Sequence, residues 1–486
     1  MSLRQSVLRG TVVLSIGEAL TYGLSFLRNM ILARMLTKAD FGIAATFAMV
    51  LTILEFAGKM AIGRFIIQDK AGDTPRFMAT AQLVQFVASV FSAVIVVVFA
   101  MPLAALFDIQ GDIRALQFLA LLPLMRGLEH LDFCRQEREL QYLPSTLVSV
   151  IPHIVITLAV WPVATWVPDY RAVLILLALR GLGTVVVSQV LAERPFRFGF
   201  DREIAGKILR FGWPLILNAI FMFGVFQGDQ FLVASFYTMS DLGAFSAAAS
   251  LALAPSFVFA RILSSVMLPL MSKAQDNPVL FAERYRLVSI SVCALSATYA
   301  VTTIIGAEAL MQFAFGAKYA GTGLILGWLG AANAYRIIRV APAIAALAKA
   351  DSHNQMISNL SRVTALVPAL AVALAQQPLW MVAMMGLLGE ALAAFVAFRR
   401  LSRRDGVPWS SSLIPSAMTS VAIAGSGLVC WSGIHQSHPV LSLAIALAAG
   451  LAAGSFIMAW FPETRAQAAK LKSSLNWRGF LAGART

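Results

Sequence analysis

The chain has 486 residues, of which 59% are hydrophobic and 13% are charged, and its mean hydropathy is +0.77. Apolar runs of 18 residues or more are long enough to cross the hydrocarbon core of a bilayer, so the composition excludes a soluble globular protein. The net charge of +14 does not indicate a nucleic-acid partner, because the basic residues sort by loop, as described below.

The apolar runs predict fourteen membrane-spanning helices. The first run is not followed by a small-residue cleavage site, so we interpret it as a retained span and not as a signal peptide. The first six spans are expected to form an N-terminal lobe over residues 1–191, and the charged segment 192–208 is expected to be a cytoplasmic linker. These six spans are predicted near 11–36, 41–63, 79–107, 113–132, 143–166 and 171–191.

The seventh span begins a second copy of the first. Segment 8–46 recurs without a gap as 209–247, and eight of the 39 aligned positions are identical, including a Thr-x-x-Asp-x-Gly motif that starts at Thr37 and at Thr238. Such a duplication is typical of transporters built from two similar lobes around a central pathway. The second lobe is expected over residues 209–398. Its spans are predicted near 209–236, 242–270, 285–311, 319–348, 354–375 and 379–398.

Two further spans, near 412–432 and 439–460, complete an all-α polytopic membrane protein. A basic connector opens this last region, 399–460, and a basic tail over 461–486 is expected to form an amphipathic helix at the cytoplasmic interface. With a cytoplasmic N-terminus, 26 of the 38 lysines and arginines fall on the cytoplasmic side, 5 on the opposite side and 7 within spans. This asymmetry obeys the positive-inside rule and places both termini in the cytoplasm.

Polar side chains inside the spans predict a water-filled cleft. Such residues are costly in lipid, so they usually face a cavity or one another. In the first span they recur at spacings of three and four, which places them on one face of a helix. The residues of this face are Ser15, Glu18, Tyr22, Ser25 and Asn29. The matching helices of the second copy also carry polar residues. The candidate sugar-binding residues are Tyr22, Ser25, Asn29, Asn218 and Gln227.

Four basic residues lie in the cytoplasmic half of their spans. Arginine suits a phosphate group, because its planar fork pairs with two oxygens and stays charged. Arg336 and Arg339 are also neighbours on one helix face, and their repulsion favours a nearby anion or acid. The alternative is that these long side chains reach the interface and bind nothing. The candidate phosphate-binding residues are Lys59, Arg261, Arg336 and Arg339.

Two residues of opposite charge occupy equivalent positions in the two copies. Arg28 aligns with Asp229, so the pair is expected to form a gate on the outward side; alternatively each residue pairs within its own lobe. Among the acids within spans, Glu18 is the candidate for ion coupling, because burial favours protonation of a carboxylate. Glu55 is expected to pair with Lys59, and Glu390 with a polar neighbour in the second lobe.

Several kinds of chemistry lack the residues that they need. The sequence contains no P-loop, no glycine-rich dinucleotide turn and no His/Cys cluster with metal-ligand spacing, so we expect no cofactor and no metal. The loops are too short to hold a catalytic domain, so we expect no enzymatic activity and no catalytic residues. Arg126, Glu129 and Arg180 are interpreted as structural or interfacial, and Asp40 and Asp241 as helix N-caps.

Two stretches carry a family resemblance. Leu32-Ala33-Arg34-Met35-Leu36-Thr37-Lys38-Ala39-Asp40-Phe41-Gly42 resembles the LARxLxxxDFG signature of polysaccharide exporters, and Leu209-Arg210-Phe211-Gly212-Trp213-Pro214 resembles the start of their second half. Over about residues 5–400 the chain resembles the Wzx-like oligosaccharide flippases of the polysaccharide transport family. This family belongs to the MATE-related multidrug/oligosaccharidyl-lipid/polysaccharide exporter superfamily.

The resemblance implies a transporter of the bacterial inner membrane that alternates between inward-open and outward-open forms. Its cargo would be a polyprenyl-diphosphate-linked oligosaccharide, such as a repeat unit of exopolysaccharide, capsule or O-antigen, carried from the cytoplasmic to the periplasmic leaflet. Membrane lipids, a polysaccharide polymerase and a chain-length regulator would be its partners. The alternative is a proton- or sodium-coupled drug or cation exporter. The spans disfavour this alternative, because they hold seven basic residues against five acids.

Overall fold

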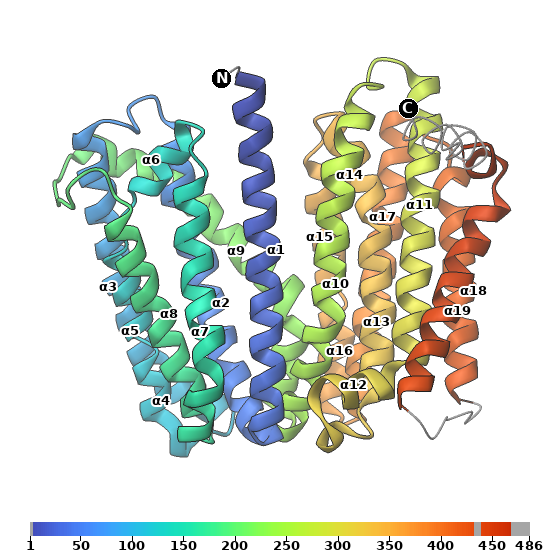
Figure 1. Cartoon of the computed structure of the whole chain (residues 1–486), viewed down its shortest axis with the longest axis horizontal. Helices are drawn as coiled ribbons and strands as arrows, with labels where there is room; N and C mark the ends of the chain where they lie inside the picture. The colour runs from blue at the N-terminus through green and yellow to red at the C-terminus, as the bar shows by residue number, and fades with distance from the viewer. Residues whose placement is uncertain (1–2, 432–438, 468–486) are drawn as a thin grey trace, which may run out of the picture. The chain divides into compact units, whose positions relative to one another are not determined.

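The computed structural model describes residues 3–431 and 439–467, without the side chains of residues 3–9, 11, 54–61, 110 and 431. Within this part every regular element is a helix (Figure 1), which confirms the expected all-helical class. Ten helical segments among the described residues are long and apolar enough to cross a membrane: 75–106, 143–166, 171–190, 202–236, 239–272, 278–305, 353–374, 379–405, 410–430 and 439–460.

The first nine elements lie in the range predicted for the N-terminal lobe. They are α1 (Leu3–Met35), α2 (Lys38–Gln68), α3 (Pro75–Leu106), η1 (Gln110–Asp112), α4 (Ile113–Phe118), α5 (Leu121–Gly127), α6 (Asp132–Arg138), α7 (Leu143–Trp166) and α8 (Arg171–Val190).

The remaining elements follow a short linker. They are α9 (Arg202–Phe236), α10 (Met239–Ser272), α11 (Pro278–Ile305), α12 (Ala307–Phe315), η2 (Ala317–Tyr319), α13 (Gly323–Ile338), α14 (Val340–Ala348), α15 (His353–Val363), α16 (Leu366–Leu374), α17 (Leu379–Asp405), α18 (Ser410–Trp431) and α19 (Pro439–Trp460). The basic connector that begins at 399 is therefore helical at first, since α17 continues to Asp405. Most of the predicted tail helix lies outside the described residues.

Three of the predicted spans each consist of two helices in place of one. The pairs are α4 and α5, α13 and α14, and α15 and α16. Each break lies three to five residues before a proline, Pro123, Pro342 or Pro368. A proline ring clashes with the carbonyl group four residues earlier and cannot donate a hydrogen bond to it, which interrupts a helix at that point. The prolines therefore account for all three breaks.

The described chain forms two compact units that do not follow the sequence halves exactly. Unit 1 contains residues 1–254 and 366–382, and unit 2 contains residues 255–365 and 383–486. The boundary in α10 falls between Ala254 and Pro255. The units group residues by contact, whereas the predicted lobes follow the sequence repeat, so the domain division at 191, 208 and 398 stays a prediction.

The two copies of the Thr-x-x-Asp-x-Gly motif begin α2 and α10 in the same way. The Thr37 side chain accepts a hydrogen bond from the N–H of Asp40 at 3.1 Å, and Thr238 accepts one from the N–H of Asp241 at 3.2 Å. The threonines therefore cap these helix starts, while the aspartates lie in the first turn. The prediction that Asp40 and Asp241 are the caps was wrong by three positions, because threonine and aspartate both suit a capping box.

The glycines of the two motifs, Gly42 and Gly243, pack against each other inside unit 1. A Cβ atom on Gly42 would lie 1.9 Å from the carbonyl oxygen of Met239, and one on Gly243 would lie 1.9 Å from that of Lys38. Met239 and Lys38 are themselves equivalent positions of the repeat. The contact is therefore symmetric, and only glycine allows the two helix starts to approach this closely.

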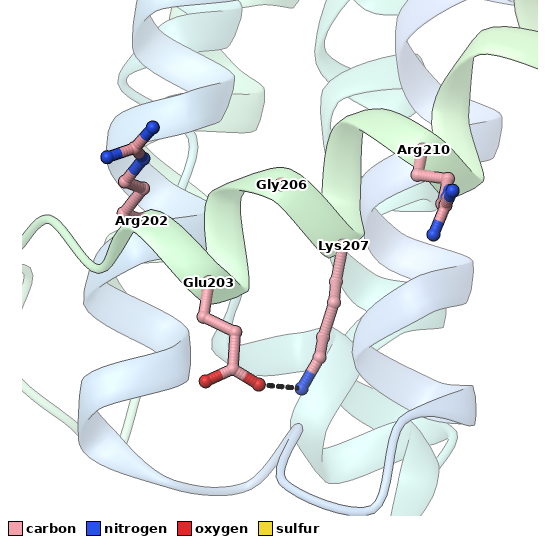
Figure 2. Close-up of a pocket in the computed structure, with 5 residues that line it drawn as sticks. All are labelled: Arg202, Glu203, Gly206, Lys207 and Arg210. Carbon is pink, nitrogen blue, oxygen red and sulfur yellow. Dashed lines mark ion pairs between the residues drawn. The ribbon is translucent and has the colours of Figure 1, made fainter.

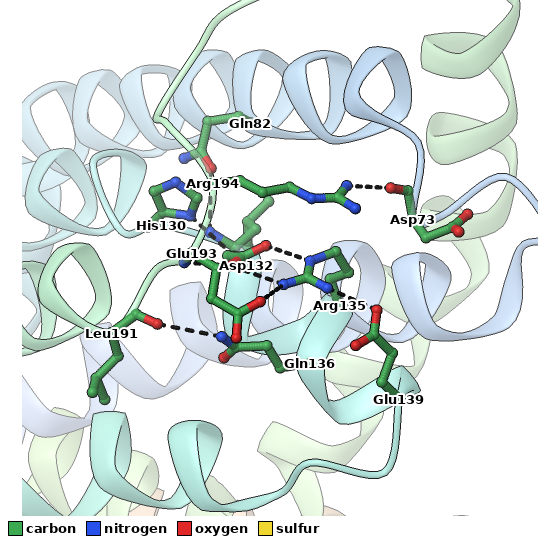
Figure 3. A network of polar contacts seen from close by, with 11 residues as sticks. Asp73, Gln82, His130, Asp132, Arg135, Gln136, Glu139, Leu191, Glu193 and Arg194 are labelled. Atoms are coloured by element: carbon green, nitrogen blue, oxygen red, sulfur yellow. Dashed lines mark hydrogen bonds and ion pairs between the residues drawn. The ribbon is translucent and has the colours of Figure 1, made fainter.

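An ion pair and hydrogen bonds hold the linker between the halves against α6 of unit 1 (Figure 3). Arg135 of α6 pairs with Asp132 at 2.7 Å, with Glu139 at 2.7 Å and with the linker residue Glu193 at 2.5 Å. The N–H of Glu193 also donates to Asp132 at 2.9 Å. Asp132 is fully buried, so it depends on Arg135 for charge compensation. Further along, the Phe198 ring lies 5.3 Å from the Phe86 ring of α3, so the linker also contacts α3.

The last two helices pack on α11 within unit 2 (Figure 1). Gly450 and Gly454 of α19 lie against Thr302 and Thr298 of α11, so closely that a Cβ atom at either glycine would lie 2.1 Å from a threonine hydroxyl. Small residues at a spacing of four let membrane helices approach in this way. On the other side, the Tyr285 hydroxyl of α11 lies 2.6 Å from Ser412 of α18.

A buried carboxylate, Asp351, joins the turn before α15 to the end of α17. It pairs with Arg404 at 2.7 Å and with Arg400 at 3.6 Å, and it accepts a hydrogen bond from the N–H of His353 at 3.0 Å. Burial acts to raise the pKa of this carboxyl, but the hydrogen bond and charge of Arg404, together with Arg400, hold the pKa below its ordinary value. The ionised form of Asp351 therefore stabilises the folded state.

This carboxylate is expected to make stability depend on acid pH. Because its folded-state pKa is depressed, its contribution is present above the unfolded pKa of about 4 and is lost as the pH falls through the folded pKa. The thermal unfolding midpoint of the Asp351→Asn variant in detergent should lie below that of the wild type at pH 7, and the difference should shrink toward pH 3. The exposed Asp276→Asn variant is the control and should behave as wild type. A constant difference at all pH values would contradict the prediction.

Candidate functional site

Unit 1 encloses a cavity of about 800 Å³ between α1, α2, α3 and α5 to α8. Three of the residues predicted on the polar face of the first span line this cavity: Glu18, Tyr22 and Ser25. Gly17 on the same helix lies so close to Thr146 of α7 that a Cβ atom there would be 2.4 Å from its methyl group. The tight packing of α1 on α7 holds the polar face of α1 toward the cavity.

The opposite walls of the cavity are rich in charges and hydroxyl groups. The Gln85 side chain donates to the carbonyl groups of Arg126 and Glu129, at 2.9 and 3.2 Å. This links α3 to the end of α5. The His153 ring lies 2.8 Å from the Ser149 carbonyl oxygen. The acidic and basic residues nearly balance, which suits a neutral ligand with many hydroxyl groups. The charged and histidine residues of the wall are Glu18, Arg64, Arg126, Glu129, Glu137, His153 and Arg180.

The cavity wall also contains three residues that were interpreted from the sequence as structural or interfacial: Arg126, Glu129 and Arg180. Each lies on the cavity wall with Glu18. The signal that could have found them is their charge within or beside an apolar span. Whether these side chains line one cavity depends on how α1, α5 and α8 pack together. The spacing of residues along the sequence does not predict that packing.

The other predicted sugar and gate residues lie elsewhere in unit 1. Asn218 is exposed on α9, and Gln227 is half-buried further along the same helix. Asn29 accepts a hydrogen bond from Arg28 at 3.4 Å. Arg28 itself is close enough to Arg180 for their like charges to interact. The gate between Arg28 and the half-buried Asp229 stays a prediction.

Unit 2 contains a cluster of three arginines around one glutamate. Glu390 in the middle of α17 pairs with Arg336 at 2.7 Å, with Arg339 at 3.2 Å and with Arg362 at 3.3 Å. The carboxylate is 1% exposed, while the Arg336 and Arg339 side chains are 17% and 13% exposed. Arg336 and Arg339, which were predicted to bind phosphate, thus lie together. They are also the polar neighbours that were expected for Glu390 in the second lobe.

Two neutral amides add hydrogen bonds to the cluster. Asn359 of α15 accepts from Arg339 at 2.8 Å, and Asn333 of α13 accepts from Arg336 at 3.5 Å. Asn333 is held in turn by Ser256 of α10, whose hydroxyl donates at 3.2 Å. The amides orient the guanidinium groups without adding a negative charge.

Arg362 is the member of the cluster that the sequence analysis missed. It was counted among the 26 cytoplasmic residues, because residues near the end of a predicted span were grouped with the adjacent loop. In the structure its side chain is 3% exposed. Of the two other predicted phosphate ligands, Arg261 lies exposed on α10 in the same unit, and the side chain of Lys59 lies outside the described residues, as does its expected partner Glu55.

The start of α9 carries a small basic hollow (Figure 2). It is lined by Arg202, Glu203, Gly206, Lys207 and Arg210, and Glu203 pairs with Lys207 at 2.7 Å. The charged side chains here are exposed. We assign this hollow no ligand.

In the described part of the chain, no three His, Cys, Asp or Glu side chains are grouped to hold a metal ion.

The chain matches the model of a known protein family and a known transport protein. A family model described as "Polysaccharide biosynthesis protein" matches residues 31–322. The succinoglycan biosynthesis transport protein ExoT of Rhizobium meliloti (strain 1021) is 26% identical over 317 residues. This match covers 64% of the chain and 62% of ExoT, which is less than two thirds of that relative's length.

Two groups of solved structures share the fold. The lipid II flippase MurJ in an inward closed conformation matches 92% of this chain and 98% of its own, with a TM-score of 0.72 and 13% identity. A multidrug resistance MATE family transporter of the MOP superfamily, in an inward-facing conformation, matches 82% of this chain and 98% of its own, with a TM-score of 0.63 and 14% identity. At these identities the likeness concerns the fold alone.

Proposed function

Because the chain belongs to the polysaccharide biosynthesis protein family, we propose that it is a flippase for a lipid-linked oligosaccharide. The cargo is a polyprenyl-diphosphate-linked repeat unit, which moves from the cytoplasmic to the periplasmic leaflet of the bacterial inner membrane by alternating access. The similarity to a succinoglycan transport protein and the MurJ-like fold support this function. The protein then acts without covalent chemistry and is not an enzyme.

The observation that carries the proposal is the cluster of Arg336, Arg339 and Arg362 around one carboxylate among apolar helices. A charged side chain at membrane depth is costly and is usually found where it serves an ion or a substrate. Arginine pairs with phosphate oxygens in two-point geometry. We propose that Arg336 and Arg339 bind the diphosphate, with Lys59 and Arg261 as further ligands along the path.

The sugar part of the cargo is proposed to occupy polar surfaces of unit 1. Tyr22 and Ser25 line its hydroxyl-rich cavity, and Asn29, Asn218 and Gln227 are the further candidates. Glu18 on the same wall is the proposed coupling residue, and Arg28 with Asp229 the proposed gate. We also propose fourteen spans in two lobes, both termini in the cytoplasm, and a polymerase and chain-length regulator as partners.

An inside-negative membrane potential favours this direction of transport. One elementary charge that crosses the membrane is worth about 2.3 kcal/mol per 100 mV. A diphosphate diester is anionic, so its exit from the cytoplasm is assisted. The two forms of the protein must still differ in affinity for the cargo or a coupling ion, since only differential binding shifts a conformational equilibrium.

The second candidate is a drug or cation exporter, because MATE transporters share the fold. A cation would need an acidic or aromatic pocket. The cluster of unit 2 has the opposite polarity, with three guanidinium groups against one carboxylate. We therefore favour an anionic cargo.

Deletion of the gene tests the proposal. The lipid-linked sugars of the deletion strain should accumulate as an intact polyprenyl-diphosphate oligosaccharide on the inner leaflet, and the polymer should be missing outside the cell. Expression of the chain from a plasmid should restore the polymer. Normal glycans together with drug sensitivity in the deletion strain would overturn flipping in favour of drug export.

A further inference from the structure

Four arginines at the end of α17 divide between two faces of the helix. Arg400 and Arg404 pair with the buried Asp351, at 3.6 and 2.7 Å. Arg399 and Arg403 each lie one residue before a member of that pair, and both are exposed. Their spacing of four places them on one face of the helix, about one turn apart. The first pair therefore stabilises the fold, whereas the second pair faces outward.

An apolar stripe continues this outward face toward the start of α17. Leu388, Leu392 and Phe395 precede Arg399 at spacings of four, three and four, and they are 54%, 45% and 46% exposed. Such spacings keep side chains on one face of a helix. Ala397, on the opposite face, is buried in unit 2. One side of α17 thus packs in the unit, and the other side presents an apolar surface that ends in two arginines.

The length of the stripe matches one leaflet of a bilayer. Leu388 and Arg399 are eleven residues apart, which corresponds to about 16 Å along the helix axis. The hydrocarbon core of a bilayer is about 30 Å thick, so each leaflet contributes about 15 Å. An acyl chain of one leaflet can therefore lie along the stripe while its headgroup lies at the level of Arg399 and Arg403.

Two aromatic rings meet one turn before Arg399. The centroid of the Phe395 ring lies 5.9 Å from that of Trp409, which is half-buried and directly precedes α18. Gly406, with a φ of 67°, ends α17, and Val407 is buried in the core of unit 2. This tight turn brings Trp409 back to α17. Tryptophan is enriched at the level of the lipid headgroups, where its ring stays apolar and its N–H can donate a hydrogen bond.

The helix dipole does not account for both outward arginines. Basic residues in the last turn of a helix interact favourably with its dipole, but this effect falls off within that turn. Arg403 lies in the last turn of α17, whereas Arg399 lies one turn earlier. Two like charges at a spacing of four repel each other, a cost that a bound anion removes. A phosphate group between them can accept hydrogen bonds from both guanidinium groups.

We propose that the outer face of α17 binds an anionic phospholipid, with its phosphate at Arg399 and Arg403 and an acyl chain along Phe395, Leu392 and Leu388. Charge complementarity and the length of the stripe support this occupant. A zwitterionic phospholipid carries a cation beside its phosphate, which the arginines repel. The segment 468–486 contains basic residues and no acid, so it lacks the charge to take the same place. The site uses none of the residues proposed for the cargo, and the inference does not depend on the proposed function.

Tryptophan fluorescence reports which lipid lies next to Trp409. The full chain is placed in phosphatidylcholine nanodiscs that contain a small fraction of dibrominated phosphatidylglycerol or, separately, of dibrominated phosphatidylcholine. The bromine atoms are near the headgroup end of the chain and quench tryptophan at short range. The part of the quenching that is missing in Trp409→Phe belongs to Trp409 itself. We expect an apparent affinity at least about fivefold higher for phosphatidylglycerol, the factor that one basic residue contributes at an anionic surface.

Substitution of the two arginines should remove this preference. Arg399→Gln/Arg403→Gln should be quenched equally by the two lipids, while Arg399→Lys/Arg403→Lys, which keeps the charge, should retain part of the preference. The matched control is Lys70→Gln/Arg197→Gln, which removes two exposed basic residues from unit 1 and should behave as wild type. In detergent, added phosphatidylglycerol should raise the thermal unfolding midpoint of the wild type and the control more than that of the glutamine variant, because a ligand of the folded state stabilises it.

Each contrary result overturns the inference for a different reason. Equal quenching by both lipids in the wild type means that the face takes bulk lipid without selection. A preference that persists in the glutamine variant, or that disappears in the control as well, means that the basic surface attracts anionic lipids in general. Quenching of Trp409 by neither lipid means that protein covers the face in the membrane. All of these results leave the flippase proposal standing.

Discussion

Replacement of Gly42 by alanine is expected to separate the starts of α2 and α10 and to abolish most transport. The new Cβ atom would lie 1.9 Å from the Met239 carbonyl oxygen and 3.1 Å from the Gly243 nitrogen, and both are backbone atoms. No side-chain rotation relieves such an overlap, so one helix start must move. Overpacking usually costs about 1–3 kcal/mol, and we expect the upper end of this range because the backbone itself is displaced.

The symmetry of the contact provides the controls. Gly243→Ala should have nearly the same effect, because its Cβ atom would lie 1.9 Å from the Lys38 carbonyl oxygen. The double variant should cost less than the sum of the two, since one displacement relieves both overlaps. Gly23→Ala on α1 is the matched control, because a Cβ atom there meets nothing within 4 Å. Polymer export by the complemented deletion strain and thermal unfolding of the purified protein measure the effect. Wild-type values for Gly42→Ala in both assays would contradict this account.

The repeat in the sequence predicted that α2 and α10 begin alike, but not that they touch. Offsets in a sequence identify equivalent residues, whereas the contact of Gly42 with Gly243 depends on how the two copies pack. The approximate positions of the long helices were predictable because the bilayer requires long apolar runs, but α1, α2 and α9 are seven or eight residues longer than their predicted spans. The helix breaks before Pro123, Pro342 and Pro368 had a visible signal, which the hydropathy pattern masked.

The candidate site shows the same limit. The polar face of α1 was predictable from its spacing, so Glu18, Tyr22 and Ser25 were correctly grouped together, and the cavity wall contains all three. The neighbourhood of Arg336 and Arg339 followed from their positions on one helix face. Arg362 could not be assigned to the same cluster, since it reaches Glu390 only through the packing of α15 on α17.

The second large effect is expected at Arg135, whose removal should release the linker from unit 1. Its side chain is 5% exposed and neutralises Asp132, which is fully buried, as well as Glu193 of the linker. Removal of one partner from a buried ion pair leaves an uncompensated charge and costs about 3–5 kcal/mol. We therefore expect Arg135→Met to lower the thermal unfolding midpoint and the amount of protein in the membrane.

Limited proteolysis distinguishes a released linker from general unfolding. Arg197 is a trypsin site in the linker, whereas Arg194 is followed by Pro195 and is not cut. In the wild type the linker is held near this site by a hydrogen bond from Arg194 to the Asp73 carbonyl group. Trypsin should cut there in Arg135→Met well below its unfolding temperature. Arg76→Met is the matched control, because its pair with Asp201 is at the surface, where the Arg76 side chain is 79% exposed and such pairs contribute about 0–1 kcal/mol. Addition of Asp132→Leu to Arg135→Met should restore part of the stability, since it removes the buried charge. If the double variant is less stable than Arg135→Met alone, the loss comes from packing and not from the uncompensated carboxylate.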